Sequence, residues 1–183
     1  MVHERSARIE TRRLRLREIV EDDAAELFAI HGNADLMKWF GVDPLVDMEA
    51  ARNLVKIFAG WRLQKNPGIR WGIEVKGNSR LIGSVGLMQW NRNWRSCTVG
   101  FELAGEAQNR GYMREALSTV LPWGFSTMQV NRIEAQVHPE NLASLKLVRA
   151  LGFVEEGLLR QVGYWRAQHH DMLQFSLLRS DWY

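Results

Sequence analysis

Cysteine is almost absent from this sequence, because Cys97 is the only one in 183 residues. A single thiol can form neither an internal disulfide nor a cysteine-based zinc cage, and this scarcity fits the reducing cytoplasm. No apolar run approaches the roughly 18 residues that a membrane span requires. The charged start, Met1–Arg8, has no apolar stretch after it. We therefore expect neither a membrane helix nor a secretory signal.

Lysine is scarce as well, although the formal net charge is +3, so most of the positive charge is carried by arginine. Arginine favours forked contacts with carboxylates and phosphates. A group of arginines lies near the start: Arg5, Arg8, Arg12, Arg13, Arg15 and Arg17. Leu14 and Leu16 alternate with three of them, which is the period of a half-buried strand. We expect a solvated strand face and no direct nucleic-acid binding; the alternative is a stripe that steers an acidic partner or a ribosomal surface.

The two common nucleotide-binding loops, G-x-G-x-x-G after a strand and G-x-x-x-x-G-K-[ST], are missing. Repeats and flexible linkers are missing too, so we expect a single domain over 1–183. The hydrophobic and turn patterns predict, in order, a strand over 8–18, helices after 21 and 47, strands over 71–75, 81–90 and 98–103, a helix over 112–125, a strand over 133–137, a helix over 142–151, and strands over 153–159 and 171–178. Asp47 should cap the second helix, and Pro122 should kink or shorten the third. This order predicts an α+β fold, a mixed sheet with helices on its faces.

A polar turn between the strand ending at Leu103 and the helix that opens near Tyr112 carries the clearest chemical signal. The first N–H groups of a helix have no partner within it, and with the helix dipole they form a site for an anion such as a pyrophosphate. Gly111 lets a ligand approach the backbone without meeting a Cβ atom. Arg110 and Arg114 add positive charge beside it. The alternative is an ordinary loop before a helix.

The same turn, Gln108-Asn-Arg-Gly-Tyr-Met113, resembles the Q/R-x-x-G-x-G/A acetyl-CoA signature of the GNAT superfamily of N-acetyltransferases. The following Arg-Glu-Ala-Leu117 is similar to the form found in its RimJ/RimL-type branch, which acetylates ribosomal-protein N-termini. Met113 departs from the broad signature, although that branch often carries Met there. Further similar segments follow one another in order along the chain: 11–17, 83–86, 99–103, 132–137, 141–144, 151–153, 156–160 and 170–172.

The resemblance implies a mixed, mostly antiparallel sheet in which two central parallel strands, here Val99–Leu103 and Ile133–Val137, splay apart. Acetyl-CoA is the implied co-substrate, and its pantetheine arm would pair with the first of these strands as an added strand does. The residues implied to hold it are Phe101, Leu103, Gln108, Asn109, Arg110, Gly111, Tyr112, Met113, Arg114 and Asn141. The amine attacks the acetyl carbonyl directly from the opposite side of the sheet. No metal is implied, and Cys97 is expected to be a small buried residue rather than a nucleophile.

Two catalytic residues follow from the resemblance. Glu102 is the candidate base, acting through water, and the alternative is a solvated strand carboxylate. Ser144 resembles the serine of the RimL-type Asn-x-x-Ser motif and would reprotonate the leaving thiolate, because the tyrosine of many members is replaced here by Val148. The alternative for Ser144 is a helix-start residue that bonds the backbone. A backbone N–H near Leu103 would meet the oxyanion.

The acceptor site is expected in loops that carry Trp39 and Phe40, Trp165, and His138 at the end of a strand. His169 and His170 are adjacent, so on a strand their rings point to opposite faces and cannot chelate one metal. We expect them to have a structural or substrate-loop role.

The N-terminal α-amine of a (ribosomal) protein is the leading acceptor. Deprotonating an α-amine at pH 7 costs about 1.4 kcal/mol, against about 5 kcal/mol for a lysine. The alternatives are a small-molecule acceptor (an amino acid, a polyamine or an antibiotic) and a catalytically idle CoA-binding module. Many relatives implied by the resemblance are dimers, so a homodimer is a further possibility.

Overall fold

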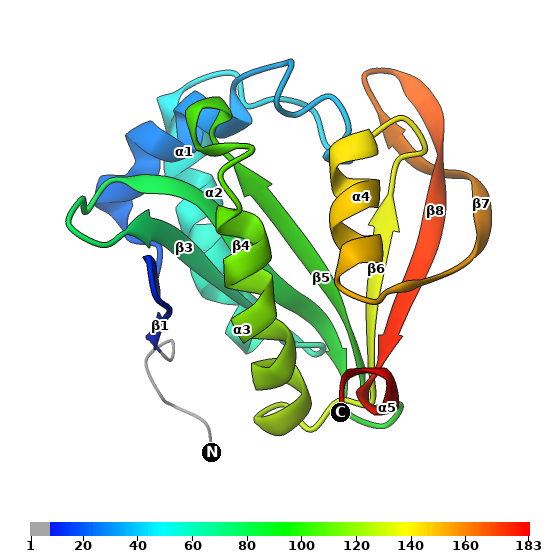
Figure 1. The fold of residues 1–183 in the computed structure, drawn as a ribbon. Coiled ribbons are helices and arrows are strands. Elements are labelled where there is room, and N and C mark those ends of the chain that lie inside the picture. Colours follow the sequence, from blue (N-terminus) through cyan, green and yellow to red (C-terminus); the bar gives the residue numbers. More distant parts are fainter. Residues whose placement is uncertain (1–7) are drawn as a thin grey trace.

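One eight-stranded sheet organises the computed structural model, which describes residues 8–183 (Figure 1). The strand order is β1-β2-β3-β4-β5-β6-β8-β7. The strands are β1 Ile9–Glu10, β2 Leu14–Arg17, β3 Ile69–Val75, β4 Leu81–Asn91, β5 Ser96–Leu103, β6 Arg132–Val137, β7 Val154–Trp165 and β8 Gln168–Leu178. Only β5 and β6 run parallel. The predicted mixed, mostly antiparallel sheet is therefore confirmed.

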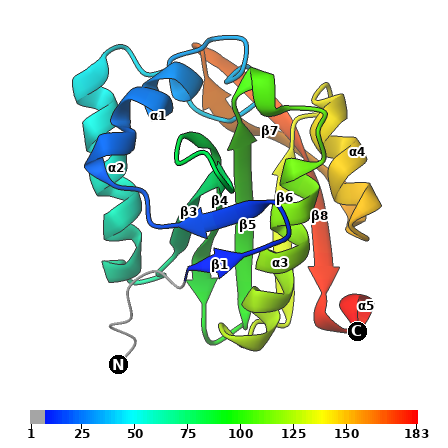
Figure 2. The same ribbon diagram turned by 60° about the vertical axis from the view of Figure 1, so that its left-hand side comes forward.

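Helices cover both faces of this sheet (Figure 2). They are α1 Ala24–His31, α2 Met48–Gly60, α3 Tyr112–Ser126, α4 Leu142–Ala150 and α5 Arg179–Trp182, with short 3-10 turns η1 Glu21–Asp23, η2 Trp61–Leu63 and η3 Gly105–Ala107. Two neighbouring residues on β3, Trp71 and Arg70, show which helices cover which face. The ring of Trp71 contacts Trp123 of α3 with centroids 5.1 Å apart, while the Arg70 guanidinium lies 4.9 Å from the ring of Phe58 in α2. Because successive side chains on a strand point to opposite faces, α2 and α3 lie on opposite sides.

The single N-terminal strand expected over 8–18 is wrong, because the structure has two short strands there. A turn separates β1 from β2: the N–H of Thr11 donates to the Leu14 carbonyl at 3.0 Å, and the N–H of Leu14 donates to Thr11 Oγ1 at 2.9 Å. Asp47 caps α2 as predicted, since its side chain accepts a hydrogen bond from the N–H of Ala50 at 2.8 Å. Pro122 does not shorten α3, which continues to Ser126. Packing of the helix against the sheet outweighs the one missing backbone donor.

The two last strands are longer than the pattern predicts. They form a hairpin whose tip is Arg166-Ala167, with φ of +52° and +56°. Two consecutive positive φ angles are those of a type I′ turn, which matches the twist of the flanking strands. Trp165, expected in a loop, is therefore a strand residue.

The parallel pair β5–β6 is joined over three residue pairs only, from Ser96↔Arg132 to Thr98↔Glu134. Beyond them the strands separate, as Figure 1 shows. The N-termini of α3 and α4 lie at this open end. The predicted splay is confirmed, and we call the space between the separated strand ends the gap.

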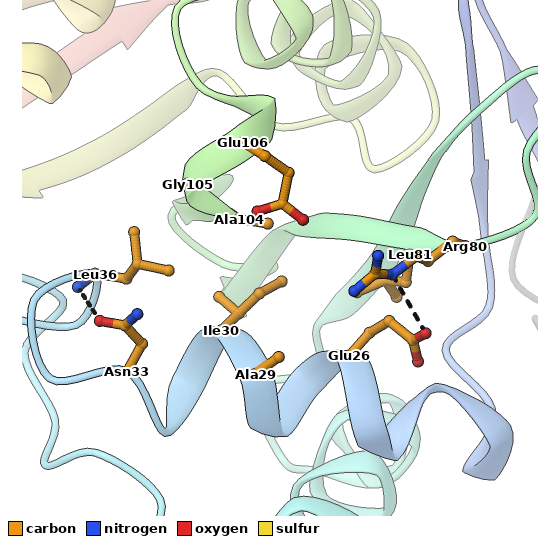
Figure 3. A pocket seen from close by; sticks show the side chains of 10 residues that line it. All are labelled: Glu26, Ala29, Ile30, Asn33, Leu36, Arg80, Leu81, Ala104, Gly105 and Glu106. Carbon is orange, nitrogen blue, oxygen red and sulfur yellow. Dashed lines mark hydrogen bonds and ion pairs between the residues drawn. The ribbon is translucent and has the colours of Figure 1, made fainter.

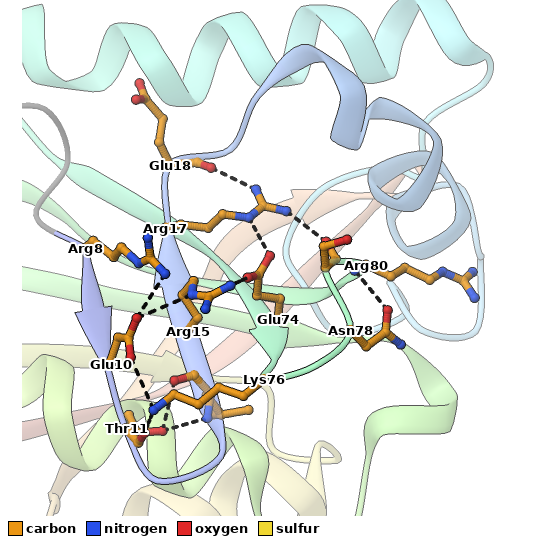
Figure 4. Close-up of polar contacts among 12 residues, drawn as sticks. Arg8, Glu10, Thr11, Arg15, Arg17, Glu18, Glu74, Lys76, Asn78 and Arg80 are labelled. Atoms are coloured by element: carbon orange, nitrogen blue, oxygen red, sulfur yellow. Dashed lines mark hydrogen bonds and ion pairs between the residues drawn. The ribbon is translucent and has the colours of Figure 1, made fainter.

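Two of the N-terminal arginines, Arg15 and Arg17, are paired with carboxylates rather than left as a free basic face (Figure 4). Arg15 Nη1 lies 2.6 Å from Glu74 Oε1, and Arg17 Nε lies 2.7 Å from Glu74 Oε2. Arg17 Nη1 also lies 2.7 Å from Asp23 Oδ2. Glu74 is only 2% exposed, so this is a partly buried ion network and not the solvated strand face expected. Arg5 lies outside the described residues.

Within residues 8–183, no helix has both the length and the apolar character needed to cross a bilayer.

Gly83 allows β4 to approach β5 closely beside Glu102. A Cβ atom at Gly83 would collide with the Glu102 carbonyl oxygen and lie 3.0 Å from the Cα of Leu103. Backbone atoms cannot yield cheaply, so we expect Gly83→Ala to lower the free energy of unfolding by about 1–3 kcal/mol. Chemical denaturation would measure this. Gly60→Ala is the matched control, because nothing lies within 4 Å of its added Cβ. Equal stability of the two variants would contradict this packing.

Candidate active site

The edge of β5 that faces the gap presents backbone groups that are not paired with another strand beyond Thr98. On its other edge β5 is paired with β4, and the N–H of Ala104 donates to the Ile82 carbonyl at 2.8 Å. Because backbone groups of successive strand residues point to alternate edges, those of Phe101 and Leu103 point into the gap. The Gln108 side-chain amide donates to the Leu103 carbonyl at 3.4 Å. This edge can accept an extended, amide-containing ligand in the manner of an added strand.

The turn before α3 is rich in free donors. Within residues 8–183, the backbone N–H groups from 109 to 114 donate no hydrogen bond, whereas that of Glu115 donates to the Gly111 carbonyl at 3.1 Å. Asn109 and Gly111 have φ of +59° and +75°, a left-handed conformation that gathers successive N–H groups into a concave nest. The 15-residue helix α3 adds its dipole. The predicted anion-binding geometry is present here.

Side chains around this turn leave the donors accessible. Met113 is 6% exposed and belongs to the core, so its departure from the signature leaves only its backbone N–H facing outward. Arg110 and Arg114 are exposed, and Tyr112 is half-buried. This cluster therefore has positive charge at its rim and no bulky side chain at Gly111.

Arg13 is a residue at this turn that sequence reasoning assigned to a strand face instead. Its Nε donates to Glu115 Oε2 at 2.6 Å, and its Nη1 donates to the Arg110 carbonyl at 3.0 Å. Thr11 Oγ1 donates to Glu115 Oε1 at 2.6 Å. Burial raises the pKa of Glu115, but the hydrogen bonds from Thr11 and Arg13 outweigh it and hold that pKa below its ordinary value. Nothing in the local sequence indicates this contact, because about a hundred residues separate the partners.

Glu102 is buried at 8% exposure, so the alternative of a solvated strand carboxylate is wrong. It accepts hydrogen bonds from Arg70 and from the Ser84 hydroxyl, and its Oε1 lies 3.1 Å from His31 Nε2. Burial alone would raise the pKa of Glu102. The Arg70 guanidinium and the hydrogen bonds from His31 and Ser84 lower it below the ordinary carboxyl value. Its assignment as base stays a prediction, and these partners oppose it, because a carboxylate with a lowered pKa binds a proton weakly.

His31, Arg70 and Ser84 are the partners that sequence reasoning missed. Arg70 is 5% exposed and lies between the Glu102 carboxylate and the rings of Phe40, Phe58 and Trp61. An arginine in a strand with apolar neighbours is the only signal the sequence offers for such a buried pair.

Ser144 lies in the first turn of α4 with its side chain half-buried. Its N–H donates to the side chain of Asn141 at 3.2 Å, so Asn141 caps the helix as predicted. Within the described part of the chain, the Ser144 hydroxyl has no hydrogen-bond partner and remains available to a ligand. Cys97 is 2% exposed, and burial raises the pKa of its thiol to about 12. It is the small buried residue expected, and such a thiol is a poor nucleophile.

Glu102 and His138 lie at the same height on opposite sides of the gap. Thr98 pairs with Glu134, and each of the two residues lies four positions beyond its strand's member of that pair. At about 3.3 Å per residue, both are about 13 Å past the last paired position. An even offset also places their side chains on one face of the sheet, the face that α1 and α2 cover.

The loop between α1 and α2 spans the gap through neighbouring residues. Phe40 contacts His31, with ring centroids 5.3 Å apart, and Trp39 stacks on His138 at 4.0 Å. Both aromatic rings are half-buried. The structure thus brings three predicted acceptor residues, Trp39, Phe40 and His138, to the α1–α2 side of the gap.

Trp165 belongs to the same group but is only 2% exposed, so its ring supports its neighbours and does not line open surface. It stacks on His170 at 3.7 Å and lies 6.1 Å from His138. Its Nε1 donates to the Lys38 carbonyl at 3.1 Å, and the N–H of Arg166 donates to Asp43 at 2.7 Å. The β7–β8 tip therefore fixes the α1–α2 loop.

A separate pocket of about 180 Å³ lies between α1 and the residues around the ends of β4 and β5 (Figure 3). Ile30 and Leu81 lie among its apolar lining, and Glu26, Arg80 and Glu106 carry its charges. None of the predicted site residues lines it. Over residues 8–183, no three His, Cys, Asp or Glu side chains converge where they could hold a metal ion.

Replacing Glu102 by Gln keeps its shape and removes the negative charge beside Arg70, which is 5% exposed. An unpaired buried charge costs about 3–5 kcal/mol, and we expect that loss of unfolding free energy at pH 7. Because the folded pKa is depressed below 4.5, the contribution of Glu102 is present above that pH and disappears as pH falls through the folded pKa. Urea denaturation should therefore show the two proteins converging only below about pH 4.5.

Glu106→Gln is the control for this experiment, since Glu106 is exposed and forms no ion pair within the described residues. It should change stability by less than about 0.5 kcal/mol. A Glu102→Gln protein as stable as the unaltered chain at pH 7 would contradict the buried pair.

Comparisons with known proteins agree with this geometry. A family model described as an acetyltransferase (GNAT) domain matches residues 13–154. The uncharacterized N-acetyltransferase YoaA of Bacillus subtilis (strain 168) is 34% identical over 171 residues, which cover 93% of this chain and 96% of that protein. A putative ribosomal-protein-serine acetyltransferase from Vibrio cholerae shares the fold with a TM-score of 0.80 and 23% identity, covering 96% of this chain and 99% of that one.

A spermidine N-acetyltransferase from Vibrio cholerae, solved in complex with CoA and spermine, also has a TM-score of 0.80, with 24% identity over 92% of this chain and 97% of that one. The splayed sheet described above is thus the GNAT fold. The chain belongs to the GNAT acetyltransferase family and is an acetyl-CoA-dependent N-acetyltransferase.

Proposed function

We propose that this protein acetylates the N-terminal α-amine of a protein, as RimJ/RimL-type enzymes do, and that a ribosomal protein is its acceptor. The observation that carries the proposal is the short β5–β6 ladder, whose gap opens toward the free N–H groups of the turn before α3. On the other face of the sheet the same gap meets Trp39, Phe40 and His138. Acetyl-CoA and the acceptor amine thus reach the same gap from opposite faces of the sheet. We place the reaction in the cytoplasm.

Acetyl-CoA is held by backbone groups in this proposal. Its pantetheine amides pair with Phe101 and Leu103 and reach Asn141, and its diphosphate binds the N–H groups of 109–114. Backbone amides cost no side-chain ordering, and the dipole of α3 favours the negative charge. The bound acetyl-CoA then places its thioester in the gap between Glu102 and His138. The Vibrio cholerae relative solved with CoA supports this use of the fold.

The reaction is direct aminolysis of the thioester. The amine nitrogen attacks the acetyl carbonyl, and a backbone N–H near Leu103 donates to the developing oxyanion. As the C–S bond breaks, Ser144 gives its proton to the thiolate and receives one from the nitrogen. Its free hydroxyl at the start of α4 supports this role.

An α-amine suits this site better than a lysine side chain. At pH 7 an α-amine needs about 1.4 kcal/mol to lose its proton and a lysine about 5 kcal/mol. The carboxylate at the gap, Glu102, is already engaged by Arg70 and has a lowered pKa. A polyamine is the second candidate, because the spermidine N-acetyltransferase is as similar to this chain as the ribosomal-protein enzyme is.

Release of free thiol from acetyl-CoA, followed with a panel of amines, tests the proposal. We expect turnover with peptides that carry a free N-terminus and none with the same peptides after N-terminal blocking. Turnover confined to spermidine or spermine would replace the acceptor by a polyamine. Binding of acetyl-CoA with no turnover on any amine would contradict catalysis altogether.

Gly111 tests the cofactor half of the site. We expect Gly111→Trp to weaken acetyl-CoA binding at least 100-fold, because the indole would cover the N–H groups of the turn. Calorimetric titration measures the affinity, and circular dichroism checks that the fold survives. Gly111→Asn is the matched control, since asparagine tolerates the left-handed φ of +75° with a smaller side chain. Unchanged affinity in the Trp variant would contradict the proposed diphosphate site.

A further inference from the structure

Two histidines, His138 and His170, lie together on the β6–β8 side of the gap, with ring centroids 5.5 Å apart. Strand register puts them on one face of the sheet. Gln136 pairs with Gln174, and their side chains hydrogen-bond at 3.1 Å on the face that α1 and α2 cover. His138 is two residues beyond Gln136 and His170 is four before Gln174, so both share that face. They therefore lie on the side from which the acceptor amine approaches.

The hydrogen bonds of His138 make it a donor toward the gap. The N–H of Glu140 donates to His138 Nδ1 at 3.1 Å, so the lone pair on that nitrogen is occupied. The ring proton is therefore on Nε2. Burial, and after it the neighbouring His170, lower the pKa of His138 below its ordinary value. His138 is consequently neutral at physiological pH and has no free lone pair with which to take a proton.

His170 has the opposite arrangement. Its Nε2 lies 3.2 Å from the backbone carbonyl of Trp165, and because a carbonyl can only accept, Nε2 carries the hydrogen. In the neutral ring the free lone pair is then on Nδ1, which has no hydrogen-bond partner among the residues that the structure describes. Stacking on Trp165, with planes 14° apart, fixes the ring. His170 is thus a half-buried imidazole held in the form that accepts a proton.

We propose that His170, through Nδ1, is the general base that takes the proton from the acceptor's ammonium group, with His138 Nε2–H oriented toward the same acceptor. The inference rests on the proposed function, which supplies the amine. One proton passes from the ammonium to Nδ1, and the Trp165 carbonyl stabilises the imidazolium through Nε2–H. The free amine then forms the N–C bond as the C–S bond breaks. His170 returns its proton to solvent after the product leaves.

Ionisable groups near His170 come from each element beside it. They are His138 and Glu140 after β6, Asp171 on β8, Arg166 at the hairpin tip, and Lys38 and Asp43 in the α1–α2 loop. Several are already engaged. Asp171 accepts from the N–H of Gln161 at 2.7 Å, Asp43 accepts from that of Arg166, and Lys38 lies over the ring of Trp39 at 4.5 Å. Among these side chains, His170 is the imidazole whose Nδ1 lone pair has no hydrogen-bond partner within residues 8–183.

His170→Gln provides the test, because a glutamine amide can still donate to the Trp165 carbonyl while the imidazole Nδ1 lone pair is lost. We expect kcat/KM for the acceptor at pH 7 to fall about 100-fold or more, with an unchanged KM for acetyl-CoA. The decrease in acceptor kcat/KM toward acidic pH that we expect for the unaltered chain should disappear in this variant. His169→Gln is the matched control: His169 is exposed, points to the other face and contacts Tyr164, so its rate and profile should match those of the unaltered chain.

A second acceptor separates loss of a base from damage to the site. A fluorinated amine that is already unprotonated at pH 7 needs no base to remove its first proton. His170→Gln should therefore retain far more of its rate with this amine than with a peptide. Equal losses of rate for both amines would overturn the inference while leaving the proposed function intact. So would a decrease in rate toward acidic pH that persists in His170→Gln, or one that disappears in Glu102→Gln instead. No turnover of any amine by the unaltered chain would overturn both.

Discussion

The separation of β5 from β6 after three residue pairs is the constraint on which the rest of the site depends. Two parallel strands that stayed paired would satisfy each other's backbone groups and close the sheet. Here the edge of β5 at Phe101 and Leu103 stays unpaired at the open end, and helices α3 and α4 both begin beside it. An unpaired strand edge normally invites association with another chain. In this fold its place beside the free N–H groups before α3 makes it suited to a cofactor.

The two faces of the sheet carry different groups. On the α3–α4 face the strands contribute apolar side chains to the main core, and at its end the turn of 109–114 presents only backbone donors. The opposite face combines a second apolar cluster under α1 and α2 with charged groups: the Arg70–Glu102 pair is buried there, and the arginines of β2 bind Glu74. The loop with Trp39 and Phe40 closes this face across the gap. The groups proposed for catalysis and those proposed to hold acetyl-CoA therefore lie on different sides of the sheet, so substitutions in one set need not disturb the other.

Local patterns in the sequence predicted the elements that depend on local physics. The cap at Asp47, the free donors at Gly111 and the alternation in the central strands are all properties of neighbouring residues, and the structure contains them. The N-terminal strand was predicted as one because alternation alone does not mark the turn at Thr11. Hydrogen bonds between Thr11 and Leu14 form that turn, and Thr11 also donates to Glu115, more than a hundred residues away.

The candidate site divides in the same way, and its residue roles stay predictions. The free N–H groups of the turn before α3 follow from spacing along one segment, whereas the partners of Glu102 come from three distant elements. The roles proposed for His138 and His170 depend on which ring nitrogen meets which backbone group, and only the folded chain determines that.

The contact between Arg13 and Glu115 has a consequence for the stability of the whole turn before α3. Arg13 and Thr11 belong to the first hairpin, yet they hold the first turn of α3 and the carbonyl of Arg110. Residues of the first hairpin thus hold the turn with the free backbone N–H groups in place. Fraying of that hairpin would loosen the proposed diphosphate site, and a nucleotide bound as proposed would in return protect the hairpin's amides from hydrogen exchange.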